Sequence, residues 1–151
     1  PEFNEPGFNF RMTDLQGAIG LVQLNKLDQF ITERARWAVW YLRELDGLEW
    51  LRCPSEPARG RHAWQSFVTW IDATKAPCPR NELMDRLHSH GIATRPGTHA
   101  VHDLGAFRHH KADCPVASEC EAQTMALPLH NRMAPTDYER VVEGLKQVST
   151  S

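Results

Sequence analysis

The sequence contains no apolar run that is long enough to cross a bilayer, and it has no signal-peptide pattern at its start. It also has no surplus of positive charge, because its formal net charge is −2 at pH 7. A dedicated nucleic-acid-binding protein needs a basic surface to neutralise phosphates. We therefore predict a protein with neither a membrane nor a nucleic acid as its partner.

Cysteine is scarce, and its spacing is that of a reduced protein. The four cysteines are Cys53, Cys78, Cys114 and Cys120. Their wide scatter does not resemble a disulfide framework, so we expect free thiols and a cytoplasmic location. His109 and His110 lie close to two of these cysteines in the sequence, but structural zinc sites usually have tighter paired spacing. We predict no metal site.

What the chain does contain is enough for one folded domain. It has 151 residues, of which 41% are hydrophobic, an ordinary content for a globular protein. It begins with Pro1 rather than with methionine, which indicates a piece of a longer protein.

A long helix is predicted to begin at Asp14 and to continue without a break to about residue 46. Thr13 and Gln16 have the spacing of a capping box, and Gly47 is a natural stop signal. Between them, apolar residues recur at the three- and four-residue steps of a helix. About thirty-three residues at about 1.5 Å each form a rod of ~50 Å, which is longer than a compact domain of this size is wide. One end should therefore overhang, unless the segment forms a helical hairpin or a coiled coil.

The rest of the chain alternates between shorter elements. The expected strands are 48–53, 64–71, 92–95 and 125–127, and the expected helices are 81–90, 116–123 and 135–148. This order predicts an α/β fold (an α+β small domain), in which a long helix is followed by a small mixed sheet that helices cover on one side.

Four segments together resemble one known family. Residues 7–20, GFNFRMTDLQGAIG, resemble the strap and helix start of the DegT/DnrJ/EryC1/StrS sugar aminotransferases. Residues 62–67 (HAWQSF), 91–95 (GIATR, followed by His102) and 125–128 (MALP) agree with the same family in order and spacing. The resemblance implies the C-terminal part of the PLP-transferase type I, or aspartate aminotransferase, fold. Its parts would be an active-site strap (1–12), a long interdomain helix (13–46) and a small α/β domain (47–151).

The resemblance also implies an activity. Members of the family use pyridoxal 5'-phosphate (PLP) to transfer an amino group, usually from glutamate, to a keto sugar carried on a nucleotide, and they pair as homodimers. In them a lysine of the large domain holds the cofactor, and the resemblance places that lysine before Pro1. The four lysines of this chain do not match it, so we expect the chain alone to be inactive.

Two polar residues of the strap are candidate ligands. Asn9 matches the family asparagine that reaches across the dimer interface to the cofactor phosphate of the neighbouring subunit. An amide donor beside a helix N-terminus suits a dianion, although Asn9 could instead form a turn. Arg11 offers a charged fork for phosphate or carboxylate at the mouth of the active site, or it pairs with Asp14 on the surface.

The loop that begins at residue 95 holds the candidate substrate-binding residues, which are Arg95, Thr98, His99 and His102. His102 matches a family histidine near the substrate, so the resemblance implies that this loop contacts the nucleotide-linked sugar. Where other members have a His-Tyr pair, this chain has Gly97 and Thr98, and the loop does not identify the sugar. Either histidine could instead be a hydrogen-bonded loop residue, and Arg95 could pair with the large domain.

Two alternatives to an aminotransferase remain at this stage. Some relatives are sugar dehydratases that use the aminated cofactor and carry a histidine in place of the cofactor-binding lysine. From a different class, the chain could be an interaction module that has the small-domain fold and pairs through its long helix. The residue at the lysine position separates the two enzymes, and a stable folded chain with a defined partner would favour the module.

Overall fold

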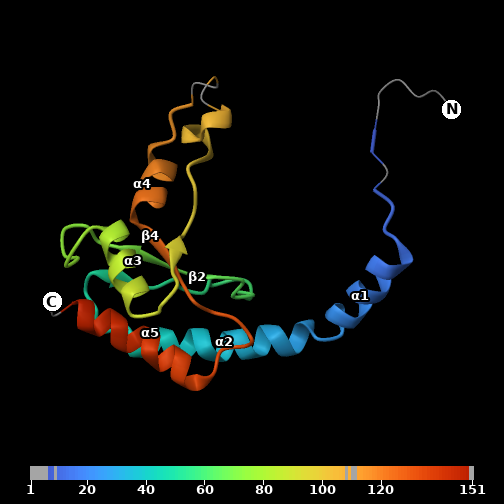
Figure 1. The fold of residues 1–151 in the computed structure, drawn as a ribbon, viewed down its shortest axis with the longest axis horizontal. Helices are drawn as coiled ribbons and strands as arrows, with labels where there is room; N and C mark the ends of the chain where they lie inside the picture. Colours follow the sequence, from blue (N-terminus) through green and yellow to red (C-terminus); the bar gives the residue numbers. More distant parts are fainter. Residues whose placement is uncertain (1–6, 9, 108, 110–111, 150–151) are drawn as a thin grey trace.

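The computed structural model describes residues 7–8, 10–107, 109 and 112–149 (Figure 1). Its helices are α1 (Asp14–Leu24), α2 (Leu27–Glu44), α3 (Arg80–Ser89), α4 (Pro115–Gln123) and α5 (Pro135–Val148). Its strands are β1 (Leu51–Arg52), β2 (Phe67–Ile71), β3 (Arg95–Pro96) and β4 (Thr124–Leu127). Two short 3-10 turns, η1 (Val101–Asp103) and η2 (Gly105–Phe107), follow β3. Among these residues, no helix combines the length and the apolar character that crossing a membrane requires.

The unbroken long helix expected from the sequence is wrong, because the helix is interrupted. α1 ends at Leu24 and α2 begins at Leu27, and Figure 1 shows α1 rising at an angle from the end of α2. At the interruption the amide of Lys26 donates to the carbonyl of Gln23, which is the tighter spacing of a turn. The break therefore falls at a local turn formed by Asn25 and Lys26.

The N-terminal end of α1 is the one predicted. The Gln16 amide donates to Oγ1 of Thr13 at 3.3 Å, and the Thr13 amide donates to Oε1 of Gln16 at 2.9 Å. This reciprocal capping box satisfies two donors that the first turn leaves unused. Every residue of α1, all of them described, is exposed or half-buried. The small domain thus contributes no core packing to this helix, and local bonds hold it.

The sheet has the strand order β1-β2-β4-β3, and each neighbouring pair is antiparallel. The mixed sheet expected from the sequence is therefore wrong, because β4 lies between β2 and β3, which run in the same direction but do not pair with each other. β2 and β4 form the central pair, in which Phe67 lies opposite Leu127 and Thr69 opposite Met125. β1 is shorter than predicted and ends ahead of Pro54, which has no amide hydrogen to donate.

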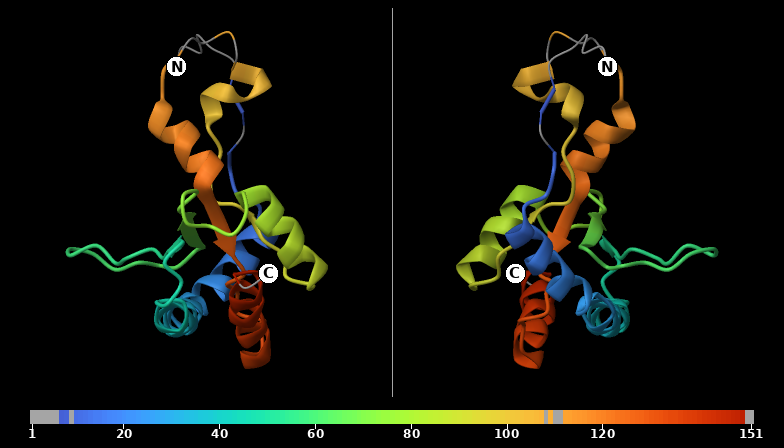
Figure 2. Two further views of the ribbon diagram at one scale, coloured as in Figure 1. Left: turned by 90° about the vertical axis from the view of Figure 1, so that its left-hand side faces the viewer. Right: turned by 90° about the vertical axis from the view of Figure 1, so that its right-hand side faces the viewer.

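Helices α2, α3 and α5 supply the helical side of the core. The inward side chains of β2, which include Phe67 and Ile71, are buried together with residues of these helices. Trp37 of α2 stacks on Tyr138 of α5 with their ring centroids 4.1 Å apart. Figure 2 shows α2 and α5 side by side below the sheet. Burial, more than its charged neighbours, raises the pKa of Tyr138 to about 12.

One glycine allows α5 to approach the segment just before β3. A Cβ atom added at Gly144 would overlap the Cδ1 atom of Ile92, a residue that is itself buried. Because a glycine has no side chain, the methyl group of Ile92 occupies this space instead. The contact links the C-terminal helix to the strand that leads into the candidate loop.

Arg34 of α2 forms hydrogen bonds with two loops that lie beside the helix. Its guanidinium donates to the carbonyl oxygens of Trp64 and Gln65, at 2.9 and 2.8 Å, and to Oδ1 of Asn131 at 3.1 Å. Asn131 in turn donates to the carbonyl oxygen of Phe30 at 3.1 Å. Trp64 is almost fully buried and has a φ of 51°, which side-chain-bearing residues seldom adopt. These bonds fix the segment before β2 and the loop after β4 against α2.

Candidate functional site

The described residues of the strap, which are 7, 8 and 10–12, are exposed. Asn9, the candidate cofactor ligand, lies outside the described residues. Arg11 is exposed and lines a shallow hollow of about 430 Å³ beside Phe10 and Met12. The rings of Phe8 and Phe10 are 86% and 90% exposed and meet edge to face, with centroids 6.0 Å apart. The strap therefore presents a cation among apolar side chains that the small domain does not cover.

The strap and the candidate loop lie on separate arms of the molecule, as Figure 1 shows. The described chain therefore does not bring Arg11 together with the substrate candidates that follow β3. A single site that used both groups of residues would need protein in addition to the arms seen here.

The first candidates of the loop lie on the surface. Arg95 begins β3 opposite Ala126 of β4, and it lines a hollow of about 290 Å³. Gly97 follows the strand, and its amide donates to the carbonyl oxygen of Thr124 at 3.1 Å. A Cβ atom at Gly97 would lie only 2.5 Å from Oγ1 of Thr124, so the loop leaves β3 pressed against the sheet. Thr98 is exposed beyond this contact.

His99 is held next to a carboxylate that sequence reasoning missed. Nδ1 of His99 lies 3.5 Å from Oε1 of Glu121 in α4. The other carboxylate oxygen of Glu121 accepts a hydrogen bond from the amide of Ala100 at 2.7 Å. The residues are too far apart in the chain for a spacing rule to pair them, so the only sequence signal was an acidic residue in a predicted helix.

His102 faces the protein rather than the solvent. Its side chain is 14% exposed, and its Nε2 lies 3.1 Å from Oγ of Ser118 in α4 and 3.5 Å from Oδ2 of Asp103. The Ser118 hydroxyl donates to the same Asp103 oxygen at 2.9 Å. The carboxylate contacts the ring nitrogen that the serine also contacts, so these three residues do not have the serial order of a hydrolase triad. They join η1 to α4.

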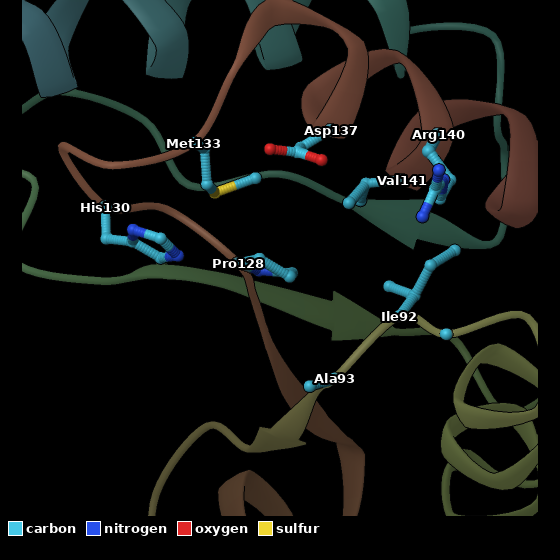
Figure 3. Close-up of a pocket in the computed structure, with 9 residues that line it drawn as sticks. Ile92, Ala93, Pro128, His130, Met133, Asp137, Arg140 and Val141 are labelled. Carbon is cyan, nitrogen blue, oxygen red and sulfur yellow. The ribbon is translucent and has the colours of Figure 1, made fainter.

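A cavity of about 360 Å³ lies between the segment before β3 and the first turns of α5, as Figure 3 shows. Ile92 and Val141 give it apolar walls, and Asp137 and Arg140 reach it from α5. Oδ2 of Asp137 accepts a hydrogen bond from the amide of Ala134 at 2.8 Å, which caps the helix. None of the candidates predicted from the sequence lines this cavity.

The described residues contain no group of three or more histidine, cysteine, aspartate or glutamate side chains arranged to hold a metal ion. His110, one of the residues considered for zinc, lies outside the described residues. Cys114 and Cys120 are free thiols, as are the other two cysteines.

A comparison with protein families gives a match over nearly the whole chain. The model of the DegT/DnrJ/EryC1/StrS aminotransferase family matches residues 2–146. The chain belongs to this family. The segments singled out in the sequence thus carried a true signal, and the predicted resemblance to the C-terminal portion of DegT/DnrJ/EryC1/StrS proteins is confirmed.

Known relatives of the DegT/DnrJ/EryC1/StrS family are similar to the chain over part of their own length. GDP-perosamine synthase from Caulobacter vibrioides is 31% identical over 144 residues, which cover 94% of this chain and 38% of the relative. Spore coat polysaccharide biosynthesis protein SpsC from Bacillus subtilis is 32% identical over 152 residues, or 97% of this chain and 39% of the relative. The solved structure of the aminotransferase TlmJ from Streptoalloteichus hindustanus has a TM-score of 0.87 at 27% identity, with 99% of this chain and 40% of that chain covered. The chain therefore spans about two fifths of the length of these relatives.

Proposed function

We propose that the chain is the C-terminal segment of a PLP-dependent enzyme that transfers an amino group, from glutamate, to a keto sugar carried on a nucleotide. Membership of the aminotransferase family is the observation that carries the proposal. It is supported by a relative named as a GDP-perosamine synthase and by another named for polysaccharide biosynthesis. The cofactor-binding lysine would lie in protein outside this chain.

The strap has a donor set that suits the phosphate group of the cofactor. Arg11 offers a guanidinium in an exposed hollow, and Asn9 offers a side-chain amide two residues earlier. The capping box uses the amides of Thr13 and Gln16, but helix geometry leaves further first-turn amides directed at the same end. Asp14 opposes an anion there, so a cation in the strap is needed to offset its charge.

The bound cofactor would supply the electron sink for amino-group transfer. The residues of this chain would hold the reactants in place. Asn9 and Arg11 would anchor anionic groups from the strap. Arg95, Thr98 and His99 would form the sugar-nucleotide side of the site, and His102 would hold the loop to α4. Such anchoring places the reacting carbon in a fixed position and so lowers the entropic part of the barrier.

We further propose that the strap and α1 pack against a second copy of the protein. The exposed apolar side chains of this arm are Phe8, Phe10, Met12, Leu15, Ile19, Leu21, Val22, Leu24 and Leu27. So many exposed apolar side chains on one arm are rare on a monomeric protein. Sizing of the complete natural protein should give a dimer, and a monomer at high concentration would contradict this part of the proposal.

The proposed reaction is tested with the complete natural protein, PLP, glutamate and a panel of nucleotide-linked keto sugars. Formation of 2-oxoglutarate together with an aminated sugar is the expected result, and Asn9→Ala or Arg11→Ala should release the cofactor more readily. Arg43→Ala is the matched control, because Arg43 is an exposed arginine on α2, far from the strap in sequence. A histidine at the lysine position, with dehydration instead of amino transfer, would contradict the proposal.

A further inference from the structure

Two histidines of the loop between β3 and α4, His99 and His102, are held in opposite ways. The His99 side chain is 62% exposed, whereas the His102 side chain is 14% exposed. Nε2 of His102 already contacts Ser118 and Asp103. The histidine that matches the family pattern is therefore turned toward its own domain, and the exposed ring belongs to a different position.

Glu121 is placed to orient the exposed ring. One of its carboxylate oxygens accepts the hydrogen bond from the Ala100 amide, which leaves the other oxygen facing Nδ1 of His99. Its main-chain carbonyl also accepts a hydrogen bond from Arg80 of α3 at 2.8 Å, so α3 braces this turn of α4. A carboxylate that faces Nδ1 favours a proton on that nitrogen and leaves a lone pair on Nε2.

We propose that His99 is the ligand-facing histidine of the loop, that Glu121 orients it, and that Nε2 of His99 accepts a hydrogen bond from a hydroxyl group of the sugar. This inference rests on the function proposed above. It makes Glu121 a positioning residue and His99 a specificity-determining one, and it gives His102 the structural role of joining η1 to α4.

The neighbouring residues support a hydroxyl as the ligand of His99. Gly97 is pressed against the sheet and has no side chain, and Thr98 is short, so neither covers the ring from the side of β3. An imidazole with its proton on Nδ1 offers an acceptor at Nε2, and a hydroxyl is a donor, whereas a phosphate at neutral pH is chiefly an acceptor. A phosphate would require the protonated ring, so pH separates the two ligands.

The orientation by Glu121 is tested by nitrogen NMR of the histidine rings in the complete natural protein, with His99→Asn used to assign the signal. Wild type should show His99 mainly protonated on Nδ1. In Glu121→Gln the side-chain oxygen can still accept from Ala100, but an NH₂ group then faces the ring, and the proton should move to Nε2. An unchanged tautomer in Glu121→Gln would overturn the positioning role. This readout requires no catalytic activity.

The ligand contact is tested by a pair of variants and a control. His99→Gln keeps a polar group near the position of Nε2, whereas His99→Asn keeps one near Nδ1. We expect His99→Asn to raise KM for the sugar nucleotide about fivefold, the usual effect of one neutral hydrogen bond, with kcat little changed and partial rescue in His99→Gln. His102→Asn should instead lower the melting temperature. A KM effect confined to His102→Asn would overturn the assignment.

Acidification distinguishes the two ligand chemistries. A proton added at Nε2 removes the acceptor, so KM should rise on acidification in wild type and stay flat in His99→Gln. His99→Gln also controls for the neighbouring ionisable residues, which are Glu121, His102, Asp103 and Arg95. A KM that falls on acidification would overturn the hydroxyl contact in favour of phosphate.

If the wild type transfers no amino group, the proposed function fails. The contact between His99 and the sugar is then tested by adding UDP-glucose or GDP-mannose and recording the NMR signals of the His99 ring. Ring signals that do not shift would overturn the contact.

Discussion

Replacement of Arg34 by alanine should destabilise the small domain. Arg34 donates to the carbonyl oxygens of Trp64 and Gln65 and to the side chain of Asn131. The variant removes all three bonds at once. It also removes the partner that holds Trp64 in a backbone conformation that a tryptophan seldom adopts.

The expected loss follows from these bonds. A hydrogen bond from a charged donor contributes about 1.5–3 kcal/mol when it is shielded from water. The bond to Trp64 is part-buried, and the bond to Gln65 is exposed and counts for less. We therefore expect Arg34→Ala to lower the free energy of unfolding by about 3 kcal/mol. With a urea dependence of ~2 kcal/mol per molar, the midpoint should fall by about 1.5 M.

Urea unfolding of the 151-residue chain, followed by tryptophan fluorescence, measures this shift. Arg34→Lys keeps the charge but loses the fork, so it should recover only part of the stability. Arg36→Ala is the control on the same helix, because its guanidinium stacks 4.9 Å from the Trp37 ring at the surface and should cost under about 1 kcal/mol. Equal midpoints for Arg34→Ala and Arg36→Ala would refute the reasoning.

Three further results are expected. Gly97→Ala should lower the melting temperature, since the new Cβ atom would lie 2.5 Å from sheet side chains, whereas Gly105→Ala meets nothing within 4 Å and should not. Thr13→Ala should speed amide exchange in α1 by removing its cap, at a cost of about 1 kcal/mol; unchanged exchange would show that the cap is dispensable. Burial raises the pKa of Tyr138 from 10.0 to about 12, so the tyrosine ionises at a lower pH in the unfolded chain than in the fold. The contribution of Tyr138 to stability should therefore be constant below about pH 10 and fall as the pH rises from about 10 to about 12. In Tyr138→Phe this fall should be smaller, and an identical slope in alkaline urea titrations would count against the burial effect.

The elements that could be predicted from the sequence are those with strong local signals. The capping box at Thr13, the run of β-branched and aromatic residues in β2 and the helical pattern of α5 all act over a few residues. α1 begins at the predicted residue, β2 covers the second part of the predicted strand, and α5 has its predicted bounds. The interruption at Asn25–Lys26 had no such signal, because Leu24 and Leu27 keep the three-residue step of a helix across it. Without core contacts on α1, nothing keeps the two helices collinear.

The candidate site was less accessible to sequence reasoning because its contacts are distant in the chain. The sequence offered both His99 and His102 as candidate substrate-binding residues. In the structure His99 lies beside Glu121 of α4, whereas His102 contacts Ser118 of the same helix. No spacing rule links a loop to a helix that follows it by some twenty residues, since the intervening chain sets the distance. The antiparallel pairing of the sheet was not predicted for the same reason, because it depends on β4 lying between β2 and β3, which are distant from it in the chain.

The close packing of Ile92 against Gly144 makes positions 92 and 144 depend on each other. A larger residue at 144 is compatible with this packing only if residue 92 becomes shorter, and a shorter residue 92 alone leaves a void beneath α5. Natural variation at the two positions should therefore be paired rather than independent. Since Ile92 lies three residues ahead of Arg95, a mismatch there would also shift the strand that precedes the proposed sugar-binding loop, so a change made in the hydrophobic interior would alter the proposed substrate contacts.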